Sequence, residues 1–115
     1  MPAAAIFESP LWSSPAARPD AGQGMTVKRT IRIVNQRGLH ARASRKLAEL
    51  ALSYDTTRIF VKREEEEADA RSLMDLMMLG AGVGQDVEVE TRGPHAEEAM
   101  TAVEALFASK FDENE

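Results

Sequence analysis

The sequence predicts one domain of the α/β (α+β) class, an open-faced β-sandwich in which a four-stranded antiparallel sheet is covered on one side by three helices. Four short segments alternate apolar and polar residues with a period of two, which is typical of strands with one wet face. Three other segments place apolar residues at helical spacing. The order of these segments is β-α-β-β-α-β-α, and the 115 residues are enough for a single domain.

The N-terminal part of the chain differs from the rest. Residues 1–24 contain four of the five prolines, mixed with alanine, serine and glycine, and they show no steady period. We therefore expect a flexible Pro/Ala-rich tail over 1–24. The folded domain is predicted to span 25–111, and residues 112–115 form an acidic C-terminal end.

The first strand is predicted from residue 25 onwards, where Val27, Ile31 and Ile33 alternate with polar residues. Residues 35–38 break this pattern as a turn. A helix follows over 41–54 because its apolar residues form one stripe. The members of that stripe are Ala43, Leu47, Leu50, Ala51 and Tyr54.

The middle of the chain predicts a hairpin and a short helix. Residues 57–63 alternate again, and a turn over 63–66 joins them to a short strand over 66–70. Residues 72–79 form a short helix that Gly80 ends.

The last strand and helix follow a glycine-rich loop over 81–84. Residues 85–92 alternate cleanly, with Val87, Val89 and Thr91 on one face. Gly93 and Pro94 open the final helix, whose stripe comprises Ala96, Ala99, Met100, Val103, Leu106 and Phe107.

Composition excludes several classes of function. The net charge is −5 with acids and bases interspersed, which argues against a nucleic-acid binder. The chain has no cysteine, so disulfides and thiolate chemistry are excluded, and the glutamates at 64–67 lack the companions of a metal site. No apolar run approaches a membrane span, and no secretory signal opens the sequence. We expect a cytoplasmic protein without metal, cofactor or membrane insertion.

The two histidines begin two different helices. A helix N-terminus carries unpaired N–H groups and a partial positive charge, and Glu97 and Glu98 complement this charge beside His95. The first turns after His40 contain cations instead, with no acid before Glu49. This inverted pattern predicts that an anion completes the His40 site, whereas His95 is expected to be a solvated helix-entry residue.

The start of the His40 helix suits a phosphohistidine. The helix dipole favours a neutral imidazole with a free lone pair, and the backbone N–H groups and the Arg42 guanidinium would hold a phosphoryl dianion. Gly38 allows a tight turn into the helix, and Leu39 is expected to anchor that turn in the core. A single histidine at a helix start is often only a cap. The cations that follow His40 are what favour a phosphoryl-accepting role over a purely capping role.

Three segments resemble the HPr phosphocarrier family of the bacterial phosphotransferase system. They are NQRGLHAR at 35–42, similar to the family's active-site segment; ARSLMDLMMLG at 70–80, similar to its regulatory serine and interaction helix; and GPHAEEA at 93–99. The resemblance covers residues 25–111. It implies a phosphoryl carrier that is not an independent enzyme, in sugar transport or in a regulatory, nitrogen-type branch.

The same resemblance implies the site and the partners. His40 would accept phosphate on Nδ1 from phosphorylated enzyme I and donate it to a IIA-type protein or domain. Arg42 would stabilise the phosphoryl group, together with the backbone of Ala41 and Arg42. A monomer is expected. The family usually has proline after the arginine, where this chain has Ala43, and Asp75 stands where basic residues are common in sugar-transporting members.

The short helix predicts a docking face. Leu76 and Leu79 are expected in the core, which leaves Leu73, Met74 and Met77 partly exposed for partner contacts. Ser72 is the predicted N-cap, and the resemblance adds phosphorylation by an HPr kinase/phosphorylase. The alternative function is therefore a regulatory binding module that acts through Ser72 and this face.

Overall fold

The computed structural model describes residues 25–112, so the predicted tail over 1–24 and most of the predicted acidic end lie outside the described residues. The elements follow the predicted order. They are β1 (Met25–Arg32), α1 (Ala41–Leu52), β2 (Arg58–Arg63), β3 (Glu66–Asp69), α2 (Leu73–Met78), β4 (Asp86–Gly93), α3 (Ala96–Ala108) and the 3-10 turn η1 (Lys110–Asp112).

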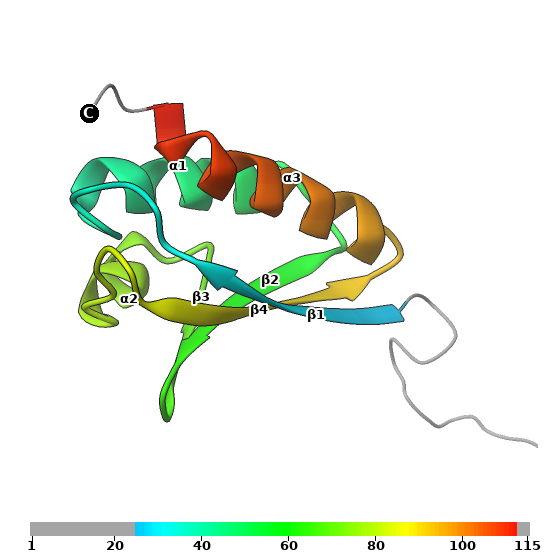
Figure 1. Cartoon of the computed structure of the whole chain (residues 1–115). Coiled ribbons are helices and arrows are strands. Elements are labelled where there is room, and N and C mark those ends of the chain that lie inside the picture. The colour runs from blue at the N-terminus through cyan, green and yellow to red at the C-terminus, as the bar shows by residue number, and fades with distance from the viewer. Residues whose placement is uncertain (1–24, 113–115) are drawn as a thin grey trace, which may run out of the picture.

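The strands form one antiparallel sheet in the order β1-β4-β2-β3. Helices α1 and α3 lie over one face of this sheet, and α2 sits at its end beside the start of β4 (Figure 1). The predicted fold class is confirmed. Strand β4 pairs with β1 on one side and, on the other, with β2, the first strand of the β2-β3 hairpin.

The core lies between the sheet and the helices. Val87, Val89 and Thr91 are buried on the helix side of β4, as their alternation predicts, and Ile59 and Val61 face the same way from β2. On the other face, acidic residues of β4 lie opposite basic residues of its neighbours in the strand register. These charges keep the uncovered face of the sheet wet.

The two main differences from the predictions follow the ends of α1 and α3. Helix α1 ends at Leu52, two residues early, because the Ser53 hydroxyl and amide both donate to the Leu50 carbonyl, at 2.6 and 3.1 Å. The sequence pattern did not predict η1, where Phe111 is buried against Phe107 with ring centroids 4.9 Å apart. Within residues 25–112 no helix is both long and apolar enough to cross a membrane.

Candidate functional site

His40 occupies the N-cap of α1 and is half-buried. Its backbone is extended, with φ −81° and ψ −172°, and its Nδ1 accepts a hydrogen bond from the Arg42 amide at an N···N distance of 3.4 Å. A nitrogen that accepts an N–H carries a lone pair, so the ring proton of the neutral imidazole is on Nε2. The distance is long for a hydrogen bond, so this bond is weak.

The charges around His40 follow the inverted pattern that the sequence predicts. The first turn of α1 contains no acidic residue. Further along, Arg45 pairs with Glu49 at 3.3 Å and Lys46 pairs with Asp112 at 3.5 Å. Arg42 is exposed, and no carboxylate of the described residues forms an ion pair with its guanidinium. It is therefore the cation of this turn that is available to an incoming anion.

The segment before His40 is held against the loop that follows α2. Gly38 has φ +66°, and the Leu39 amide donates to the Ala81 carbonyl at 3.0 Å. A Cβ on Gly38 would lie 2.5 Å from the Ala81 oxygen and 2.7 Å from the Gly82 Cα. Leu39 is buried, which confirms its predicted anchoring role. This contact joins residues distant in sequence and fixes the turn that presents the imidazole.

His95 has different surroundings. It precedes α3, its side chain is exposed and caps no N–H group, and its Nδ1 lies 3.7 Å from a carboxylate oxygen of Glu98. An open hollow of about 400 Å³ lies beside it, lined in part by Tyr54 and Glu98. Burial, and to a smaller extent the charge of Glu98, raises the pKa of Tyr54. An anion would meet acidic groups here, as the sequence predicts.

Ser72 is the N-cap of α2. Its hydroxyl accepts a hydrogen bond from the Asp75 amide at 3.2 Å, so its predicted capping role is confirmed. The side chain is partly exposed. Asp75 occupies the first turn, where a carboxylate complements the helix dipole.

The face of α2 divides as predicted. Leu76 and Leu79 are buried, whereas Leu73, Met74 and Met77 are exposed. Met78 was not among the predicted docking residues, yet it is the most exposed large apolar side chain of the described residues, at 74%. The i, i+4 spacing from Met74, itself 65% exposed, is the signal that places Met78 on the same face.

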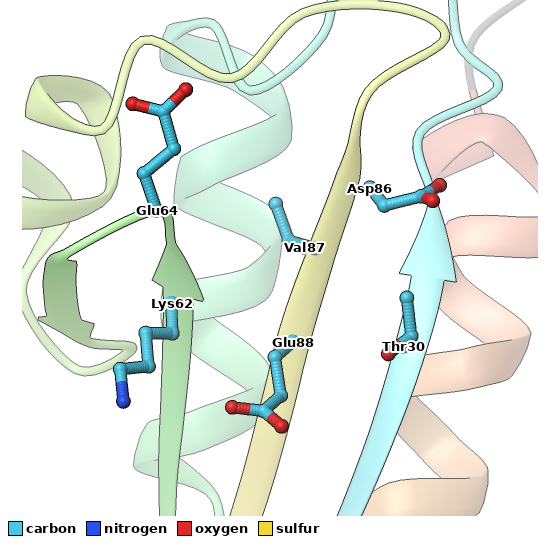
Figure 2. A pocket seen from close by; sticks show the side chains of 6 residues that line it. All are labelled: Thr30, Lys62, Glu64, Asp86, Val87 and Glu88. Atoms are coloured by element: carbon cyan, nitrogen blue, oxygen red, sulfur yellow. The ribbon is translucent and has the colours of Figure 1, made fainter.

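A second hollow, of about 290 Å³, lies on the uncovered face of the sheet (Figure 2). Figure 2 shows Lys62 beside Glu88 on neighbouring strands, with Asp86 and Glu64 toward the end of the sheet where β4 begins. Lys62 and Glu88 are cross-strand partners, and Arg32 bonds Asp86 at 3.0 Å. Opposite charges therefore neutralise one another here, and the residues that line this hollow include neither a histidine nor a cysteine.

A four-stranded sheet with three helices, and a histidine at the amide-rich start of the first helix, is the arrangement of a small phosphoryl-carrier protein. The chain belongs to the HPr family: residues 27–109 match the family described as "PTS HPr component phosphorylation site". It is a phosphocarrier of the phosphotransferase system, and such proteins carry phosphoryl groups without being independent catalysts.

Named relatives and solved structures agree with this assignment. "Phosphocarrier protein NPr" of Escherichia coli is 47% identical over 90 residues, covering 78% of this chain and 100% of the relative. "Phosphocarrier protein HPr" of Cupriavidus necator is 45% identical over 89 residues, covering 77% and 99%. The crystal structure of HPr-C-His from Thermoanaerobacter tengcongensis matches with a TM-score of 0.73 and 34% identity, covering 77% of this chain and 99% of that one.

Proposed function

We propose that His40 is the phosphoryl-accepting residue, receiving the group from phosphorylated enzyme I and donating it to a IIA-type protein or domain. One observation carries the proposal: Nδ1 of His40 lies at the N-cap, 3.4 Å from the Arg42 amide nitrogen. In the transfer, the Nδ1 lone pair attacks phosphorus. The bond from phosphorus to the donor atom breaks, and its electron pair stays with the donor.

The start of α1 supplies electrostatic stabilisation of the product. Once Nδ1 is bonded to phosphorus, the Arg42 amide loses its acceptor, and a phosphoryl oxygen takes over that hydrogen bond. The Ala41 amide and the Arg42 guanidinium add positive charge beside the dianion. Phosphoryl transfer depends on positioning and charge stabilisation more than on covalent assistance, so these groups are sufficient for a carrier.

The docking face of α2, comprising Leu73, Met74 and Met77, is proposed to bind both partners. Helices α1 and α2 pack together, and the loop after α2 bonds the residue before His40, so a protein seated on α2 is close to the start of α1. Met and Leu side chains adapt to more than one partner surface. This favours one shared surface for donor and acceptor, which a carrier uses in turn.

The regulatory, nitrogen-type branch is the better assignment of pathway. Relatives with 47% and 43% identity carry the name "Phosphocarrier protein NPr", although other relatives are named HPr. Asp75 also makes the docking face less basic than sugar transport would predict. We place the carrier in the cytoplasm as a monomer, because enzyme I and a IIA-type partner must each reach the same face in turn.

A labelling experiment tests the acceptor. The protein is incubated with enzyme I and radiolabelled phosphoenolpyruvate, alongside His40→Ala and the matched control His95→Ala. We expect label on the wild type and on His95→Ala and none on His40→Ala. Equal labelling of the two variants would remove His40 from the proposal.

A second candidate function is regulation through Ser72, which the exposed apolar face beside it favours. Phosphoserine at this helix start would place a dianion next to Met74 and Asp75 and would weaken docking by an acidic partner surface. Pull-downs with enzyme I compare Ser72→Asp and Met74→Ala with the wild type. Reduced binding by both variants supports regulation by a kinase such as HPr kinase/phosphorylase, and unchanged binding by both argues against it.

A further inference from the structure

Three consecutive carbonyl groups lead into α1, and each accepts a hydrogen bond. The Gly38 oxygen accepts from Nδ2 of Asn35 at 2.8 Å, and the Leu39 oxygen accepts from Oγ of Ser44 at 3.1 Å. The His40 oxygen accepts from the Ser44 amide at 2.8 Å. Asn35 and Ser44 both have 0% exposure. The carbonyl oxygens of Gly38 and Leu39 are therefore tied to buried side chains.

These bonds decide which end of each peptide dipole meets an anion at His40. A carbonyl oxygen is the negative end of its peptide unit, so an oxygen turned outward beside the imidazole would repel a phosphoryl dianion. Ser44 holds the Leu39 oxygen inside, leaving the N–H groups at the start of α1 to face the anion. Because Ser44 is fully buried, no water competes for its hydroxyl, and the bond persists.

Position 43 is an alanine, so the first turn of α1 lacks the restraint that a proline would give it. Proline, the residue that the family resemblance leads one to expect there, fixes φ near −65° and stiffens a first helical turn. Ala43 supplies no such constraint. The hydroxyl of the next residue instead ties the first turn back to Leu39, five residues earlier.

We infer that Ser44 is a positioning residue for phosphoryl transfer, holding the Leu39 carbonyl away from His40 and replacing the restraint of a proline at position 43. The inference rests on the proposed role of His40 as the acceptor. Ser44 touches neither the phosphoryl group nor the reacting nitrogen; it acts through the backbone.

The chain offers a matched control at its other helix start. Thr91 also has 0% exposure, and its hydroxyl donates to the Ala96 carbonyl at the beginning of α3, at 2.8 Å. Thr91→Val therefore removes a hydrogen bond from a buried hydroxyl to a backbone carbonyl at a helix start, as Ser44→Ala does. It does so at the start of α3, away from His40. A loss of global stability would affect both variants, whereas a loss of positioning would affect only Ser44→Ala.

The experiment measures single-turnover transfer from phosphorylated enzyme I for Ser44→Ala, Thr91→Val, Ala43→Pro and the double variant Ala43→Pro/Ser44→Ala. We expect Ser44→Ala to transfer about tenfold more slowly, corresponding to about 1.4 kcal/mol of barrier, with Thr91→Val within about twofold of wild type. The double variant should recover most of the lost rate. In NMR spectra of the unphosphorylated proteins, the Arg42 amide resonance should move in Ser44→Ala and stay in place in Thr91→Val.

Several results would overturn the inference. Wild-type transfer by a folded Ser44→Ala would do so, as would equal losses in Ser44→Ala and Thr91→Val, or no recovery with proline at position 43. If Ser44→Ala does not fold, Ser44→Cys replaces it, and its weaker donor should give an intermediate rate. Failure of wild-type His40 to accept phosphate would instead refute the proposed function, and the Arg42 amide resonance would still test the positioning.

Discussion

Gly38→Ala tests whether the close contact before His40 is as tight as the structure indicates. The new Cβ would lie 2.5 Å from the Ala81 oxygen and 2.7 Å from the Gly82 Cα, both backbone atoms that cannot rotate away. Gly80→Ala is the matched control, because Gly80 has nearly the same dihedral, φ +65° against +66°, and no atom lies within 4 Å of its added Cβ.

The two substitutions separate two costs. A non-glycine residue in the left-handed region costs roughly 1–2 kcal/mol, and both variants incur it. Overpacking adds about 1–3 kcal/mol more, and only Gly38→Ala incurs that part. We therefore expect a loss of about 2–5 kcal/mol for Gly38→Ala, a large share of the roughly 5–15 kcal/mol that stabilises a typical domain.

Urea denaturation at 25 °C, followed by circular dichroism, measures both losses, and the m-value should stay constant. Phosphoryl transfer should fall in Gly38→Ala and not in Gly80→Ala, since only the first displaces the turn that presents His40. Equal destabilisation of the two variants would refute the close approach of Gly38 to residues 81–82.

Three further predictions concern other parts of the fold. Phe111→Ala should lower the free energy of unfolding by about 3–5 kcal/mol in urea melts, because the ring is buried against Phe107; a loss below about 1 kcal/mol would remove η1 from the core. Ser72→Ala should cost about 1 kcal/mol in thermal melts through loss of the α2 cap, whereas Ser72→Asp, which keeps a capping oxygen, should cost less. Glu90→Gln should destabilise the protein by about 1 kcal/mol at pH 7, because the hydrogen bond from Arg92 lowers the pKa of Glu90. Because the pKa of Glu90 is lower in the folded state, its carboxylate stabilises the fold at pH values above its unfolded pKa of about 4.3, and this stabilisation is lost as the pH falls through the folded-state pKa. The difference in stability between Glu90→Gln and the wild type should therefore vanish in acid. A difference that does not depend on pH would contradict this.

Local patterns were sufficient to predict most of the fold. The alternation around Val87 and Val89 placed the buried face of β4, and the cations after His40 distinguished its helix from that of His95. These features depend on residues within a few positions of one another. Side-chain periodicity predicts the buried face of a strand, and the charges near a helix end predict whether that end favours an anion.

Features that depend on distant contacts were not predictable in the same way. The amide of Leu39 bonds the carbonyl of Ala81, and nothing in either segment alone indicates the pairing. The role of Ser44 is similar, because a serine inside a helix predicts only a weak helix former until its hydroxyl partner is known. Phe111 lies beyond the last helical stripe and is buried because η1 turns it back onto Phe107.

We propose that the amides opening α1 receive a phosphoryl dianion on Nδ1 of His40. NMR of the phosphorylated protein, carrying ¹⁵N-labelled histidine and backbone, tests it most directly. We predict ³¹P coupling to Nδ1 of His40 together with a downfield shift of the Ala41 and Arg42 amide protons. Coupling to Nε2, or amide resonances that do not move on phosphorylation, would contradict the account.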